Sequence, residues 1–319
     1  MESTVHPTLR RFLAAASIAV TTIALTAGTA SAAQERPTPA TPAPAAQGAS
    51  WAHTVTGKIV PVTPTRAVTP LHPQKITHPR LDYMGSTIAA HDKAAATPKA
   101  GAIRPAASVP QLPGIDVSDY QGDINWASIA GDLDFVYAKA SEGTYYTNPD
   151  FDNQYEGPYD EGLIRGSYEF ANPADASGTA DADYFIANGG GWSGDGKTLP
   201  GALDIEYDPY SSNECYSLTQ SQMVTWIKAF VTEYAAKEHV YPVIYSTTDW
   251  WTSCTGNSTA FSSLDPLWIA NYTASGGGTL PASWGFYTFW QYADSGSLPG
   301  DQDVFNGAYA QLQTLATKG

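Results

Sequence analysis

Short apolar segments with the composition of β-strands recur between residues 114 and 305, and most are separated by polar or helical stretches. Eight strands are predicted, at 115–117, 135–140, 164–170, 201–207, 243–246, 267–270, 287–291 and 302–304. Strands that alternate with helices are typical of a parallel sheet, because parallel neighbours need a long crossover connection. The pattern predicts an α/β fold, a single TIM-like (β/α) barrel of about eight mostly parallel strands.

The helical segments between these strands are uneven in strength. The clearest helix spans 220–238, where apolar residues recur at helical spacing. Thr219 and Gln222 match a capping box at its start. Residues 151–162 and 179–189 carry weaker helical patterns, and the last three connections are too short for full helices. The ring of helices around the barrel is therefore expected to be incomplete.

The fourth strand carries two acids, Asp204 and Glu206, two positions apart. Side chains of a strand alternate faces, so both acids point to one side, roughly 6.5 Å apart at their Cα atoms. Two carboxylates this close are costly to ionise together, so one should keep its proton to a higher pH. A protonated acid beside an anion is what glycosidic bond cleavage uses. Two solvated acids at a strand end are the alternative.

Two further acids are expected in the same place. Asp116 alternates with Ile115 and Val117 in the first strand, and Asp303 lies near the end of the last strand, which neighbours the first in a closed barrel. Active sites of such barrels lie at the carboxyl ends of the strands. Asp116, Asp204, Glu206 and Asp303 are therefore the predicted catalytic acids, and scattered surface carboxylates are the alternative.

Aromatic residues are dense around the predicted strand ends. They are Tyr120, Tyr168, Phe170, Tyr207, Trp268, Trp290 and Tyr292. Flat rings suit the C–H faces of a sugar ring, so these residues are the predicted substrate-binding set. Core packing is the alternative for any single ring.

The amino-terminal third reads as targeting and processing sequence. Arg10 and Arg11 precede an apolar run over 12–27, and a small-residue cleavage site follows at 30–32, which predicts a signal peptide over 1–32 and a secreted protein. A membrane anchor is the alternative, but the run is short for a span. Residues 33–110, broken by prolines apart from a possible short helix over 78–92, are predicted to be a linker or pro-segment.

Charge divides the chain at residue 110. Residues 111–319 hold 6 Lys and Arg against 27 Asp and Glu, whereas residues 33–110 hold 8 against 3. The acidic part argues against nucleic acids and anionic membranes as partners. The opposite charge of 33–110 suggests docking on the domain over 111–319, and a small wall-binding module is the rival interpretation.

The sequence offers few residues for zinc binding, a Ser-His-Asp hydrolase or phosphate binding. His239 is the one histidine after residue 110, so neither a zinc site nor a Ser-His-Asp hydrolase is favoured, and no metal or cofactor is expected. Residues 191–198 match a phosphate-loop pattern, but they lack the required strand before and helix after. Cys215 and Cys254 are expected to form a disulfide in an exported chain, with free buried thiols as the alternative.

Several motifs carry a resemblance to a known family. They are Gly114-Ile115-Asp116-Val117-Ser118-Asp119-Tyr120-Gln121, Leu203-Asp204-Ile205-Glu206, Trp290-Gln291-Tyr292 and Asp301-Gln302-Asp303-Val304-Phe305-Asn306. From about residue 112 to 319 the chain resembles the glycoside hydrolase family 25 lysozymes. The resemblance implies a flattened barrel that cleaves the β-1,4 bond after N-acetylmuramic acid in peptidoglycan.

The resemblance also implies roles for single residues. Glu206 matches the proton donor, and Asp204 matches the acid that orients the 2-acetamido group or attacks as nucleophile. Asp116 and Asp303 match the other two acids, and Tyr168 matches a tyrosine that contacts substrate. The position after that tyrosine, often His in the family, is Glu169 here.

The sequence thus predicts a secreted, monomeric lysozyme that acts on peptidoglycan strands without a cofactor. A chitinase-like hydrolase is one rival, although Gly201 and Ala202 stand where its extra acid would be. A wall-binding barrel without activity is the other rival, although such a protein would be expected to lose one of the paired acids.

Overall fold

The computed structural model describes residues 51–53, 59–61, 80–92, 110–272 and 276–319. Strands β1 (Trp51–His53) and β2 (Ile59–Pro61) pair with each other in antiparallel fashion, within a unit of their own. The predicted signal peptide and most of the predicted pro-segment lie outside the described residues.

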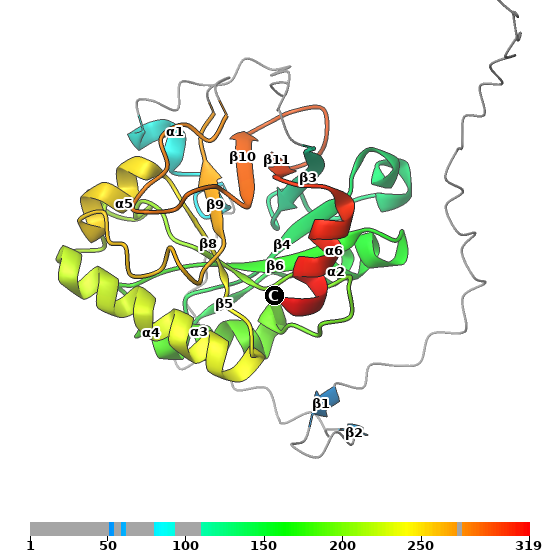
Figure 1. Cartoon of the computed structure of the whole chain (residues 1–319), viewed down its shortest axis with the longest axis horizontal. Coiled ribbons are helices and arrows are strands. Elements are labelled where there is room, and N and C mark those ends of the chain that lie inside the picture. Colours follow the sequence, from blue (N-terminus) through cyan, green and yellow to red (C-terminus); the bar gives the residue numbers. More distant parts are fainter. Residues whose placement is uncertain (1–50, 54–58, 62–79, 93–109, 273–275) are drawn as a thin grey trace, which may run out of the picture. The chain divides into compact units, whose positions relative to one another are not determined.

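Eight strands of the described chain close into a barrel, with β11 antiparallel to both its neighbours and the other six pairings parallel (Figure 1). In order around the barrel they are β3 (Leu112–Val117), β11 (Asp301–Phe305), β10 (Phe289–Ala293), β9 (Leu267–Ala270), β8 (Val243–Ser246), β7 (Ala202–Asp204), β6 (Ile164–Phe170) and β4 (Phe135–Glu142), which pairs again with β3. A short strand, β5 (Tyr146–Thr147), pairs with β4 outside this ring. The predicted barrel of about eight mostly parallel strands is confirmed.

Helices surround the barrel unevenly. They are α1 (Ile88–His91), α2 (Phe151–Asp160), α3 (Gly178–Phe185), α4 (Gln220–Glu238), α5 (Thr248–Thr255) and α6 (Tyr309–Lys318), with 3-10 turns η1 (Trp126–Ser128) and η2 (Ala130–Asp132) and the π-helical η3 (Ile186–Gly190). Helices α3 and α4 pack against each other on one flank (Figure 1). The described residues between β9 and β10, and between β10 and β11, contain no helix, so the ring is incomplete as predicted.

The structure also corrects the helix prediction. Helix α4 has the predicted bounds, and its capping box is formed by Thr219 and Gln222. Helix α5 lies in a connection that was predicted too short for a full helix, and it has eight residues, begun by a Thr247 side chain that accepts from the Trp250 N–H. No described helix is long and apolar enough to cross a membrane.

Apolar side chains form separate clusters inside and outside the barrel. The inner cluster includes Tyr137, Tyr168, Trp268 and Phe289, all fully buried. Gly166 of β6 leaves room for it, since a Cβ there would lie 2.3 Å from the Tyr137 ring. The main outer cluster packs α3, α4 and α5 onto the sheet, and the disulfide Cys215–Cys254 ties the loop after β7 to α5.

Candidate active site

The paired acids of the fourth strand lie together as the strand alternation requires. Strand β7 ends at Asp204, and the chain continues so that Leu203 and Ile205 pack in the outer cluster while Asp204 and Glu206 face the other way. The carboxyl groups of Asp204 and Glu206 contact each other, and both side chains are fully buried. Among the described residues, no donor reaches either carboxyl oxygen of Asp204.

Strands β3 and β11 bring three more acids to this place. Asp116 of β3 lies opposite Asp301 of β11, and the Asp303 carboxyl contacts that of Asp116. The Trp268 indole N–H donates to Asp303 Oδ1 at 3.0 Å. Asp116, Asp204, Glu206, Asp301 and Asp303 interact electrostatically with one another, and we call these five residues the acid cluster. The structure therefore brings the four predicted acids together and adds Asp301.

Gln291 of β10 connects this cluster to two tyrosines. Its side-chain amide donates to Asp116 Oδ2 at 2.7 Å and to Asp301 Oδ2 at 3.1 Å. Its carbonyl oxygen accepts from the hydroxyl groups of Tyr245 (2.6 Å) and Tyr272 (2.8 Å). Sequence reasoning missed Gln291 and Asp301 as site residues. The signal was present for Asp301, because Asp301 and Asp303 repeat the spacing of Asp204 and Glu206.

Burial raises the pKa of every acid in the cluster, because a low-dielectric surrounding disfavours the charged form. The pKa of Asp116 rises to about 7 even though Gln291 donates to it. The pKa values of Asp204, Asp301 and Asp303 are raised well above the ordinary range, in each case by burial first and neighbouring carboxylates next. In this structure the acid cluster therefore retains protons near neutral pH.

Comparison with known proteins agrees with this geometry. The sequence profile described as "Glycosyl hydrolases family 25" matches residues 115–301, which include the Asp204 and Glu206 pair. The chain belongs to glycosyl hydrolase family 25. The predicted family resemblance is confirmed, and the protein is a glycoside hydrolase.

Three relatives illustrate how far the likeness extends. Lysozyme M1 of Streptomyces globisporus is 43% identical over 263 residues, which cover 80% of this chain and 88% of the relative. N,O-diacetylmuramidase of a Chalaropsis species is 47% identical over 208 residues, 64% of this chain and 98% of the relative. The crystal structure of a bacterial lysozyme from Streptomyces coelicolor is 45% identical with a TM-score of 0.62, over 65% of this chain and 98% of that one.

The predicted substrate-binding aromatics of this family 25 chain fall into two groups. Tyr168 and Trp268 lie in the barrel next to the acid cluster, and Phe170 ends β6 opposite Asp204. Tyr120 is 43% exposed in the loop after β3. By contrast, Trp290 and Tyr207 lie in the outer cluster, although Tyr207 directly follows Glu206 in the chain, and Tyr292 packs beside Trp290. Substrate contact stays a prediction for all seven.

Glu169, the departure from the family pattern, faces the helices. Its fully buried carboxyl contacts that of Asp181 in α3, and no donor among the described residues reaches either oxygen of Glu169. Burial raises the pKa of Glu169 well above its ordinary range and that of Asp181 to about 7. Two buried carboxyls in contact are stable only while they share a proton.

Replacing Glu169 by Gln should therefore flatten the pH dependence of stability. Because the folded pKa values are raised, the stability of the pair is complete below about pH 4 and is lost as pH rises through the folded values. The Gln amide can donate to ionised Asp181, so from pH 5 to pH 8 wild type should lose about 1–3 kcal/mol more unfolding free energy than E169Q.

Urea unfolding of both proteins at pH 5 and pH 8 measures this difference in unfolding free energy. The exposed Glu161→Gln is the control and should follow wild type; parallel profiles of E169Q and wild type would contradict the expectation.

A segment that precedes the barrel in the chain covers the acid cluster. In residues 80–92, which we call the covering segment, the Gly85 N–H donates to Glu206 Oε1 at 2.7 Å. The Thr87 N–H donates to Glu206 Oε2 at 3.2 Å, and the Thr87 hydroxyl donates to the same oxygen. These bonds lower the pKa of Glu206, but burial outweighs them and raises it to about 7. The predicted short helix over 78–92 is present as α1, with only four residues.

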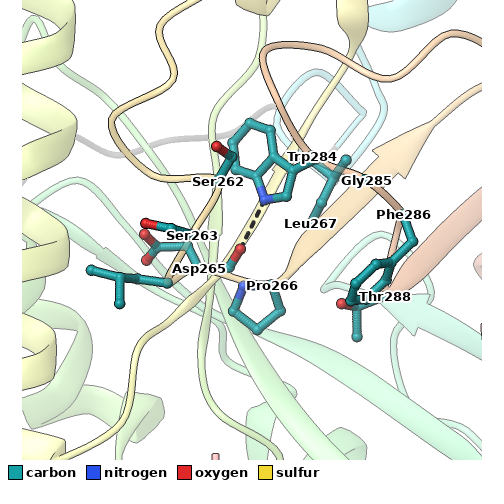
Figure 2. Close-up of a pocket in the computed structure, with 10 residues that line it drawn as sticks. Ser262, Ser263, Asp265, Pro266, Leu267, Trp284, Gly285, Phe286 and Thr288 are labelled. Carbon is teal, nitrogen blue, oxygen red and sulfur yellow. Dashed lines mark hydrogen bonds between the residues drawn. The ribbon is translucent and has the colours of Figure 1, made fainter.

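A pocket at the other end of the barrel is unsuited to glycoside cleavage. It lies at the amino end of β9 and is lined by residues 262–267, 284–286 and 288. Figure 2 shows the Trp284 indole N–H donating to the main-chain oxygen of Asp265, at 2.9 Å. Asp265 is the one ionisable residue of this lining, so the pocket has no pair of acids. In the described chain, no group of three or more His, Cys, Asp or Glu residues is arranged to hold a metal ion.

Proposed function

We propose that the protein is a lysozyme that hydrolyses the β-1,4 bond between N-acetylmuramic acid and N-acetylglucosamine in bacterial peptidoglycan. The observation that carries the proposal is the contact between Asp204 and Glu206 within a cluster of buried acids in a family 25 barrel. Relatives named lysozyme and N,O-diacetylmuramidase support muramic acid as the sugar recognised.

In the proposed mechanism Glu206 is the general acid. It donates its proton to the glycosidic oxygen as the bond from C1 to that oxygen breaks. The carbonyl oxygen of the substrate's 2-acetamido group attacks C1, supported by Asp204, and water then opens the cyclic intermediate with Glu206 as base. This route gives net retention. Asp116 and Asp303 bind and orient the sugar, and Tyr168 with the other predicted aromatics contacts its rings.

Direct attack by water on C1 is the competing route, and it gives inversion. Proton NMR of the freshly released reducing sugar distinguishes the two, because the β anomer appears first with retention and the α anomer with inversion. An initial α product would overturn the acetamido route while leaving Glu206 as the acid.

The proposed activity is tested with a suspension of purified peptidoglycan. The expected result is a loss of turbidity with new reducing ends on muramic acid, identified by mass spectrometry of the released fragments. A chitinase-like enzyme would instead cleave chitin oligosaccharides, and a wall-binding barrel would cleave neither. Either of those outcomes contradicts the proposal.

We further propose that the protein is exported and acts as a monomer. The predicted signal peptide over 1–32 and the disulfide Cys215–Cys254 support export, because disulfides persist in oxidising compartments. Intact mass of the secreted protein, with and without reductant, gives the mature start and the disulfide. A mass that still includes residues 1–32 would contradict export by this signal.

A further inference from the structure

We infer that the covering segment, residues 80–92, is an inhibitory element that blocks the acid cluster and keeps the enzyme inactive until the segment is displaced. The inference rests on the proposed function, because it concerns access of a glycan to Glu206. Four observations carry it: burial of the acids, hydrogen bonds to Glu206, the fit of Gly85, and contacts at both ends of the segment.

The acids are inaccessible while the segment is in place. Asp204, Glu206 and Asp303 have no exposed surface, although a general acid needs to approach the glycosidic oxygen to hydrogen-bond distance. Met84 and Ile88 of the segment are also fully buried and belong to the inner cluster with Tyr168 and Trp268. A sugar ring cannot reach Glu206 unless these side chains leave.

Hydrogen bonds from the segment also disfavour the protonated form of Glu206, which a general acid needs. Both oxygens of Glu206 accept hydrogen bonds from the segment, through the Gly85 N–H, the Thr87 N–H and the Thr87 hydroxyl. Donors to a carboxylate favour its ionised form. Asp204, which no described donor reaches, is then the member of the pair that favours the proton. Docking therefore opposes the protonation state that the proposed mechanism assigns to Glu206.

Gly85 occupies a position where a residue with a side chain would be strained and would clash with its neighbours. Its φ is +87°, a conformation that L side chains rarely adopt. A Cβ there would lie 2.4 Å from the Tyr272 hydroxyl oxygen and 2.7 Å from Gln291 Oε1. The neighbouring residue is held as well, since the Met84 N–H donates to the Tyr168 hydroxyl at 3.2 Å and Gln291 Nε2 donates to the Met84 carbonyl at 3.4 Å.

Contacts at both ends of the segment secure it across the site. At one end Asp82 pairs with Lys139 Nζ at 3.3 Å and accepts from the Tyr210 hydroxyl at 3.0 Å. The Tyr83 ring stacks on Tyr120, with centroids 5.3 Å apart.

At the other end the His91 ring stacks on Tyr207, with centroids 4.6 Å apart. Tyr120 and Tyr207 are two of the predicted sugar-binding rings. The segment therefore occupies the surfaces that a glycan is expected to use.

The barrel itself does not require such a segment. The Chalaropsis relative aligns over 98% of its own length with only 64% of this chain, so a member of the family can consist of the barrel alone. In this chain, residues 93–109 connect the segment to the residues before β3. Cleavage of the chain between Asp92 and Pro110 would separate the inhibitor from the enzyme without cutting the barrel.

The inference is tested by cutting the full chain at an inserted recognition sequence for a specific protease, placed between residues 93 and 109. At nanomolar enzyme, where a released peptide dissociates, cutting should raise the rate of peptidoglycan clearing about 10-fold or more. Synthetic peptide 80–92, added in excess, should reverse the rise. In the uncut chain Gly85→Ala should raise the rate, whereas the exposed Ala90→Ser should leave it low.

A second readout is independent of activity. Carbodiimide with glycinamide labels accessible carboxyl groups, and the peptide that contains Glu206 is quantified by mass spectrometry. Uncut wild type should protect Glu206, while cut wild type and uncut G85A should label it. Glu161, which is exposed, should be labelled equally in every form.

The outcomes separate the two proposals. Equal labelling of Glu206 in cut and uncut chains would overturn the inhibitory role of the segment. Clearing at the same measurable rate before and after cutting would also overturn that role, and it would leave the lysozyme proposal standing. Labelling that rises on cutting without any clearing in either form would support the segment and contradict the lysozyme proposal. Should G85A fail to fold, as judged by thermal unfolding, the cut wild-type chain decides the question alone.

Discussion

Replacing Glu206 by Gln, in the chain freed of residues 80–92, is expected to lower the rate of peptidoglycan hydrolysis by a factor of about 10² or more. Gln has nearly the shape of Glu and can still accept and donate hydrogen bonds, but it has no proton to give to the leaving oxygen. The carboxyl of Glu206 is the one in contact with Asp204, and two carboxyl groups in contact favour a shared proton. The measurement is the initial rate of release of reducing ends at saturating substrate.

Glu238 provides a matched control for this substitution. Its carboxylate is partly buried at the end of α4 and accepts from the Trp192 N–H at 2.7 Å, away from the acid cluster. E238Q makes the same chemical change away from the acid cluster. It should therefore keep the rate of hydrolysis within about 2-fold of wild type, since substitutions away from such features usually have small effects. The assignment of the general acid fails if E206Q hydrolyses peptidoglycan at the wild-type rate.

The parts of the fold that the sequence predicted are those with a local, periodic cause. Strands β6, β8 and β9 have the predicted bounds, and in β8 and β9 a short apolar run ends at polar residues. Helix α4 was found by its apolar spacing and its capping box. Strand β7 is shorter than predicted, since its ladder with β6 and β8 ends at Asp204. The alternation continues past the ladder, so Glu206 still points toward the acids.

The parts that sequence reasoning missed depend on distant partners. Helix α5 is short and contains Trp250 and Trp251, and its stability comes from packing of both rings in the outer cluster. The outward direction of Glu169 follows from its alternation with Tyr168 in β6, but its contact with Asp181 of α3 depends on a distant element that no local pattern of β6 reports.

The covering segment lies on the barrel through contacts that differ from the charge attraction suggested by the sequence. Opposite net charges suggested docking of 33–110 on the acidic domain. In the described segment, however, the ion pair to the buried part of the barrel runs the other way, from acidic Asp82 to Lys139. The contacts that hold the segment over the acids are hydrogen bonds to Glu206 and the burial of Met84 and Ile88. Neither kind of contact is visible in a charge count.

Replacing Gln291 by Leu is expected to destabilise the fold by about 3–5 kcal/mol. Leu fills a similar volume but removes both donors to the acids and the acceptor of two tyrosine hydroxyls, all in a fully buried place. Each buried polar group left without a partner costs about 1–3 kcal/mol. Loss of the donor to Asp116 also raises the pKa of that acid further, because the amide favours its ionised form.

Urea unfolding measures this loss, and Gln302→Leu is the matched control. Gln302 lies on the neighbouring strand β11, and its side chain donates only to the carbonyls of Leu298 and Gly300 among the described hydrogen bonds. Q302L should therefore cost about 1–2 kcal/mol and leave activity of the freed enzyme nearly unchanged. Q291L should in addition lower activity, because Asp116 and Asp301 lose the group that fixes their positions. A Q291L variant no less stable than Q302L would mean that the acid cluster is held in place by its strands alone, without the amide that joins it to Tyr245 and Tyr272.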